Sequence, residues 1–176
     1  VWGPPLHALL FLANSAGMIG ILMFTQRVFR PRARWARRAV VLAAALSAVA
    51  FVVTATVERF EVRVIPNPTY HAVVAARVAA MVWMTVESLL YLGQLRRRQR
   101  LGLADPLLVN RFLLWGIGAG AAGLGSATGG LVQWWTQLPP IELPWLMLSS
   151  SLHGLAAAVA MWLAFVPNAA YLRMIR

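Results

Sequence analysis

Three histidines are the side chains in this sequence best suited to hold a cofactor. His7 and His71 lie near the starts of two long apolar segments, at similar depth, and His153 lies further into a third. A b-type haem in a helical bundle takes two imidazoles at matched depth, and imidazole also suits copper or zinc. No second histidine lies at the depth of His153. We therefore favour histidines that form hydrogen bonds within the protein, and we predict no metal site. The three remain candidates for binding haem, a pigment or a quinone.

Four other polar side chains interrupt the apolar segments: Asn14, Arg77, Glu87 and Arg111. A charge inside a membrane costs about 2.5–3.5 kcal/mol on insertion scales and is usually buried with a partner. Arg77 and Glu87 are ten residues apart in one segment, about 15 Å along a helix, too far for a direct pair. Arg111, on the next segment, lies at a depth from which it can reach Glu87. We therefore predict a Glu87–Arg111 ion pair, with Asn14 and His153 as structural polar groups between helices.

The nucleophiles form no convincing catalytic arrangement. Ser126 stands in the glycine-flanked stretch GLGSATG and His153 lies on the following segment, a combination that an intramembrane serine protease would need. The sequence has no HExxH motif, no phosphate-binding loop and no paired aspartates. A proton or ion path would need carboxylates at successive depths, and Glu87 has none beside it. We expect a protein that is not an enzyme.

Composition indicates a protein whose main solvent is lipid. The chain is 60% hydrophobic and 12% charged, against about 45–50% and about 25% in soluble domains. The absence of cysteine excludes disulfides, iron–sulfur clusters, thiolate zinc sites and covalent haem attachment. The absence of lysine excludes a retinal Schiff base.

Five apolar segments are long enough to cross a bilayer, which takes about 20 helical residues. They cover approximately residues 6–26, 36–57, 69–95, 106–135 and 143–171. The sequence therefore predicts an all-α, polytopic membrane bundle with one transmembrane domain over residues 1–176. Asp105 and Pro106 form a good helix start, and Pro167 should kink the last helix. The five helices also fit the last five of a seven-helix domain.

Positive charge is concentrated in two of the loops. The net charge is +11, every basic residue is arginine, and ten of the sixteen lie within residues 27–38 and 96–100. Arginine-rich short loops face the cytoplasm, which predicts a bacterial inner-membrane protein with its N-terminus outside and its C-terminus in the cytoplasm. These loops should attract anionic lipid head groups. No basic face with interleaved aromatics is available for nucleic acid.

Small residues dominate the fourth segment, where residues 116–130 read GIGAGAAGLGSATGG. In lipid such a sequence remains helical because its backbone groups have no water to bond. Small residues four apart let helix backbones approach closely. The predicted packing residues are Gly116, Gly120, Gly123, Gly125 and Gly129. They lie on several faces, so we expect a central helix; docking of another subunit, a pigment, a quinone or a lipid is the alternative use.

Three functions are compatible with these patterns. The first is an accessory or scaffolding subunit of a larger membrane complex, respiratory, photosynthetic or similar, whose partners are lipids and other membrane subunits. The second is the membrane-embedded sensor or receptor-like domain of a bacterial signalling protein. The third is a small transporter. We rank the accessory subunit first, because a sensor needs an output domain and a transporter needs a polar path.

The topology can be tested by cysteine labelling, because the chain has no cysteine of its own. A single cysteine at Arg34 should react with an impermeant maleimide only after the membrane is opened. Labelling of this position in intact cells would overturn the orientation.

Overall fold

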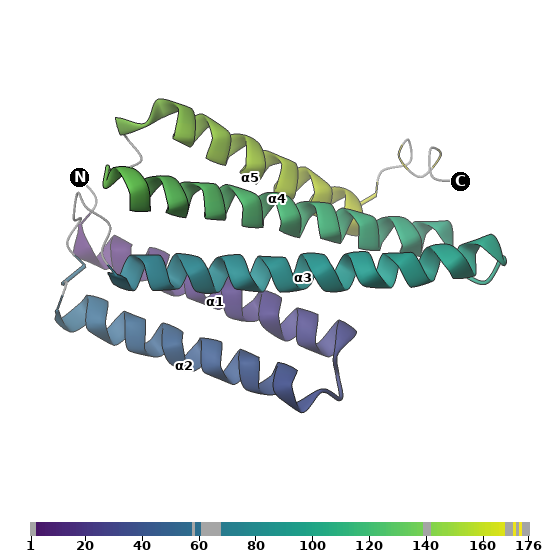
Figure 1. The fold of residues 1–176 in the computed structure, drawn as a ribbon, viewed down its shortest axis with the longest axis horizontal. Coiled ribbons are helices and arrows are strands. Elements are labelled where there is room, and N and C mark those ends of the chain that lie inside the picture. Colours follow the sequence, from purple (N-terminus) through teal and green to yellow (C-terminus); the bar gives the residue numbers. More distant parts are fainter. Residues whose placement is uncertain are drawn as a thin grey trace.

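The computed structural model of the 176-residue chain describes residues 3–57, 59, 60, 68–138, 142–167, 171 and 173. Within these residues it contains five long α-helices and no strand (Figure 1). The helices are α1 (Pro4–Phe29), α2 (Arg34–Thr56), α3 (Pro68–Arg100), α4 (Pro106–Thr136) and α5 (Pro144–Phe165). The predicted all-α fold is therefore confirmed for the described part of the chain.

The helices follow the five predicted segments, with two differences at their ends. α3 continues to Arg100 instead of ending near residue 95, because arginine is a good helix former and its charge interacts favourably with the C-terminal end of the helix dipole. α5 ends at Phe165, two residues before the predicted kink at Pro167, and Tyr171 beyond that proline is again helical. Pro167 disfavours the helical conformation at Val166, whose φ and ψ are −127° and 64°.

The start of α4 shows how local sequence sets a helix boundary. The Asp105 carboxylate accepts a hydrogen bond from the Leu107 N–H at 2.9 Å, and Pro106 occupies the first helical position. This satisfies one of the free N–H groups of the first turn, and proline leaves one fewer to satisfy. The predicted cap is confirmed.

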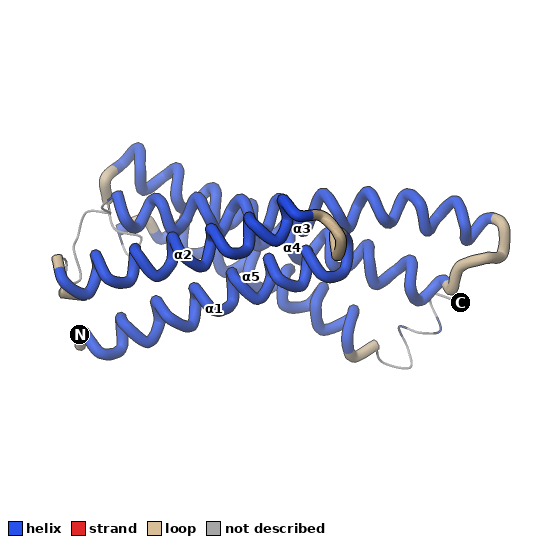
Figure 2. Tube along the Cα trace, turned by 90° about the horizontal axis from the view of Figure 1, so that it is seen from below, coloured by secondary structure: helices blue, strands red, loops and turns tan. Residues whose placement is uncertain are grey.

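The helices run along one long axis, and α4 lies between α3 and α5 (Figures 1 and 2). α4 packs extensively against both neighbours, whereas α1 and α2 form a hairpin that contacts α3 much less. The α3–α4 hairpin extends beyond the α1–α2 loop at one end of the bundle (Figure 1). The molecule thus consists of a tightly packed group, α3–α4–α5, and a loosely attached pair, α1–α2.

All five helices are long and apolar enough to span a membrane. The shortest, α5, has 22 residues, about 33 Å at the rise of an α-helix, compared with about 30 Å of hydrocarbon in a bilayer. Large apolar side chains such as Val41, Leu131 and Leu155 are exposed on the outside of the bundle. Such a surface is expected for helices that face lipid.

Two glycines of α4 lie where a side chain would collide with a neighbouring helix. A Cβ at Gly130 would lie 2.7 Å from Cγ1 of Val74 on α3, and a Cβ at Gly125 would lie 2.8 Å from Cβ of His153 on α5. Real Cβ atoms essentially never approach this closely. Glycine is therefore required on both sides of α4, and the helix approaches two neighbours through two different faces.

The remaining predicted packing glycines divide into two groups. Gly116 and Gly123 approach side chains of α3 to 3.0 Å when a Cβ is added. Gly120 stands at an ordinary contact distance of 3.6 Å, and Gly129 approaches only a side chain of its own helix. Gly130, which the sequence analysis did not single out, makes the closest approach to α3.

Alanine substitution should separate the glycines that pack from those that do not. Gly125→Ala and Gly130→Ala should each lower Tm in detergent, because overpacking typically costs about 1–3 kcal/mol. Gly154→Ala is the matched control, since Gly154 lies in α5 with nothing within 4 Å of the added Cβ. That change should stabilise the protein by about 0.5–1 kcal/mol through the better helix propensity of alanine. If all three variants melted at or above the parent Tm, the close-packing argument would fail.

Candidate functional site

Glu87 of α3 is a buried acidic residue that two other side chains bind. Its side chain is buried, and Oε1 accepts hydrogen bonds from Arg30 Nε at 2.7 Å and from Trp83 Nε1 at 3.2 Å. Arg30 follows the last residue of α1 and is half exposed. The hydrogen bond to Glu87 and the negative charge of Glu87 raise the pKa of Arg30 above its ordinary value. The guanidinium therefore stays charged and fixes the α1–α2 loop to α3.

An aromatic contact extends this ion pair to α2. The rings of Trp35, in the first turn of α2, and Trp83 lie 5.2 Å apart between centroids. Trp83 precedes Glu87 by one helical turn, so both side chains lie on the same face of α3. Arg30, Trp35, Trp83 and Glu87 thus join α1, α2 and α3 at the basic loop. We call these four residues the loop anchor.

The predicted pairing of Glu87 with Arg111 was wrong. α4 packs against the face of α3 that carries Met81, Thr85 and Leu89, and Glu87 lies on the face turned toward the α1–α2 loop. Arg111 belongs to α4, and its buried Nε has no hydrogen-bond partner. Similar depth therefore did not bring the two groups together, because they lie on different sides of α3.

Arg77 and Asn14 form a second polar link between α1 and α3. Nη1 of Arg77 donates a hydrogen bond to Oδ1 of Asn14 at 3.3 Å, and Asn14 is exposed on the surface of α1. Nε of Arg77 is buried without a hydrogen-bond partner. Among the described residues the ion pair that forms is Arg30–Glu87, so Arg77 has no counter-charge there. We call the Arg77–Asn14 contact the outer seam.

The histidines occupy three separate environments. His7 Nδ1 and His71 Nε2 are each buried without a hydrogen-bond partner, at the first turns of α1 and α3. The ring of His71 packs edge-on against that of Trp134, with centroids 4.8 Å apart. In the described parts of the chain, no group of three or more histidine and acidic side chains is placed to hold a metal ion.

His153 is already engaged within its own helix. Its Nδ1 lies 2.7 Å from the carbonyl oxygen of Ser149, which accepts the hydrogen bond, and 3.5 Å from the Ser149 hydroxyl. The side chain packs on Gly125 of α4. This arrangement ties α5 to the glycine face of α4.

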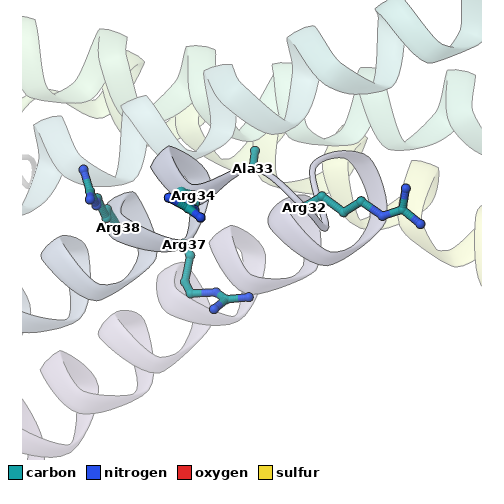
Figure 3. A pocket seen from close by; sticks show the side chains of 5 residues that line it. All are labelled: Arg32, Ala33, Arg34, Arg37 and Arg38. Atoms are coloured by element: carbon teal, nitrogen blue, oxygen red, sulfur yellow. The ribbon is translucent and has the colours of Figure 1, made fainter.

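Arginines line a cavity of about 360 Å³ at the α1–α2 loop. The lining residues are Arg32, Ala33, Arg34, Arg37 and Arg38 (Figure 3). Their guanidinium groups spread around the start of α2 instead of meeting at one point (Figure 3). A neighbouring cavity of about 430 Å³ shares Arg37 and is lined partly by apolar side chains of α1 and α2. None of the arginines that line these two cavities forms an ion pair with a described carboxylate.

An apolar cleft separates α2 from α1 and α3 near their other ends. Its volume is about 330 Å³. It is lined by Met18 of α1, by Leu46, Ser47, Val49, Ala50 and Val53 of α2, and by Pro68, Thr69, Ala72, Val73 and Ala76 of α3. The lining side chains suit a hydrocarbon chain or a small lipophilic molecule.

Sequence reasoning missed three members of the loop anchor. Trp83 had a usable signal, because its spacing of four residues from Glu87 places both on one helix face. Arg30 had none, because it is one of six arginines between residues 27 and 38 that the sequence does not distinguish. The contact of Trp35 with Trp83 depends on how α2 is rotated against α3, which the sequence does not give. The contact of Asn110 Nδ2 with the hydroxyl oxygen of Tyr171 was also not anticipated.

Comparison with protein-family models, with curated proteins and with solved structures found no match for this chain.

A double-mutant cycle tests the pair at the centre of the loop anchor. Glu87→Gln should lower Tm in detergent, because it leaves Arg30 without its counter-charge. Adding Arg30→Gln should cost little more, since the interaction is already lost. Arg111→Gln serves as the matched control and should show no coupling to Glu87→Gln. Coupling to Arg111 but not to Arg30 would contradict the assigned pair.

Proposed function

We propose that this chain is a non-catalytic accessory subunit of a larger complex in the bacterial cytoplasmic membrane. It crosses the membrane five times, with its N-terminus outside and its C-terminus in the cytoplasm. A helix of a partner subunit docks on the outer seam, where Asn14 and Arg77 meet. The basic loops support the orientation, because arginine-rich short loops remain on the cytoplasmic side.

The observation that carries this proposal is that Arg77 forms no ion pair with any acidic residue that the structure describes. Arg77 lies nine residues beyond Pro68, about 14 Å along α3 from its start. Its hydrogen bond goes to a neutral amide, and its buried Nε has no partner. Charged groups at membrane depth are normally paired with one another or with backbone carbonyls. A carboxylate supplied at this depth by a partner helix would complete the seam.

The exposure of Asn14 supports the same conclusion. A polar amide facing hydrocarbon is unfavourable, whereas interhelical hydrogen bonds of asparagine stabilise helix association by about 0.6–2 kcal/mol. Asn14 has donor groups left over, since the described bond uses its carbonyl oxygen as acceptor. The seam therefore offers both a positive charge and an amide to one approaching helix. That chemistry favours a helix with an Asp or Glu over a lipid tail.

Native purification tests the proposal directly. When isolated from its own membrane in mild detergent, the chain should migrate with a second polypeptide on native gels and in native mass spectrometry. Arg77→Gln should release that polypeptide while leaving the Tm of the isolated bundle nearly unchanged, because glutamine can still bond Asn14. Arg98→Gln, an exposed arginine near the end of the same helix, should leave the complex intact. A chain that migrates alone, or a complex indifferent to Arg77→Gln, would refute the docking role.

The apolar cleft favours a second candidate, a membrane-embedded sensor of a lipophilic molecule. The cleft lies between the loosely attached α2 and the helices α1 and α3, so an occupant there would shift α2 against the rest. The same purification separates the two candidates. A partner polypeptide lost on Arg77→Gln supports the subunit, whereas copies of this chain alone carrying a bound lipophilic molecule support the sensor.

A further inference from the structure

The cavity between the last turn of α1 and the first turns of α2 has one charged end and one apolar end. Its volume is about 430 Å³. Gln26 and Arg27 of α1, Pro31 of the loop and Arg37 of α2 form the polar end. Met23 of α1 and Val40 and Val41 of α2 form the apolar end. We infer that this cavity is a binding site for one anionic phospholipid, with the phosphate between Arg27 and Arg37 and an acyl chain along Met23 and Val41.

Among the described residues, no carboxylate forms an ion pair with the arginines at the charged end of this cavity. The loop and its flanks carry six arginines between residues 27 and 38, and the described ion pair uses only Arg30. Arg37 also lines the adjoining arginine cavity and points away from Arg38 (Figure 3). A phosphate between Arg27 and Arg37 would receive charge-assisted hydrogen bonds from two helices. The rest of the cluster would attract a negative head group from a distance.

The apolar end explains why the anion should carry a hydrocarbon chain. Met23 and Val41 are both exposed, so this wall opens to the surroundings of the helices and not to the core. Leu42, next to Val41 on α2, is also exposed. A free phosphate or a nucleotide would leave this wall unused, whereas a phospholipid covers both ends at once. Burying apolar surface contributes roughly 25 cal/mol per Å² to such binding.

The position of the cavity along the helices suits the same ligand. It lies where α1 ends at Phe29 and α2 begins at Arg34, the level at which transmembrane helices meet lipid phosphates. Nothing in this site overlaps the outer seam, which is formed by the middle of α1 and the first half of α3. Binding of lipid here is therefore independent of any partner subunit at Arg77.

Lipid binding to the purified full chain tests the site. Native mass spectrometry should show one retained phosphatidylglycerol, and added phosphatidylglycerol should raise Tm more than phosphatidylcholine does. The double variant Arg27→Gln/Arg37→Gln should weaken phosphatidylglycerol binding by about tenfold or more. This is the loss expected when two arginines no longer attract an anionic head group. Arg97→Gln/Arg98→Gln removes the same charge from the end of α3, away from the cavity, and should weaken binding less than about twofold.

Three outcomes would overturn the inference. Equal losses in the two double variants would mean that the lipids respond to net charge and to no particular site. An equal rise in Tm with inorganic phosphate would mean that the anion alone is recognised and that the apolar wall has no part. A preference for phosphatidylcholine, or no retained lipid, would mean that the cavity does not bind an anionic phospholipid. Circular dichroism of each variant checks that its helices are intact.

Discussion

The close approach of α4 to two neighbouring helices is the constraint on which the rest of the structure depends. In a membrane, lipid tails are as apolar as leucine, so helices associate through packing and hydrogen bonds and not through the hydrophobic effect. Gly130 lets α4 reach α3, and Gly125 lets it reach α5. Because α4 occupies one face of α3, the opposite face with Trp83 and Glu87 is left for α1, α2 and their loop. The glycines therefore decide where the polar groups of α3 can find partners.

Two polar contacts attach α1 to α3 where packing is sparse. Asn14 meets Arg77 near the middle of α1, and Arg30 meets Glu87 just beyond its end. α2 has no such bond to α3 among the described residues, and contacts it through the Trp35–Trp83 rings and the side chains along the cleft. The pair α1–α2 thus follows α3 mainly through α1. A directional hydrogen bond between helices fixes their rotation more strictly than dispersion alone does.

Sequence reasoning recovered the helices because a long apolar run has few other stable states in lipid. The position of a residue along its helix follows from its number, because the rise per residue is constant. Sequence reasoning failed on rotation about the helix axis. Glu87 and Arg111 were paired by depth, yet the glycine-rich α4 has small residues on every side and gives no sign of which face meets α3. At the end of α5, helical structure is interrupted next to Pro167, close to the position where the sequence predicted a kink.

Unequal packing also makes the molecule unequally compressible. Protein interiors packed to crystal-like density resist compression, whereas space between side chains yields. In the group α3–α4–α5, a Cβ added at Gly125 or Gly130 would collide with the neighbouring helix, so these helices cannot approach much more closely there. The cleft of about 330 Å³ beside α2 is a volume that can change. If the five helices span a bilayer, a rise in its lateral pressure would move α2 toward α1 and α3 first, with the three-helix group as the fixed frame of that motion.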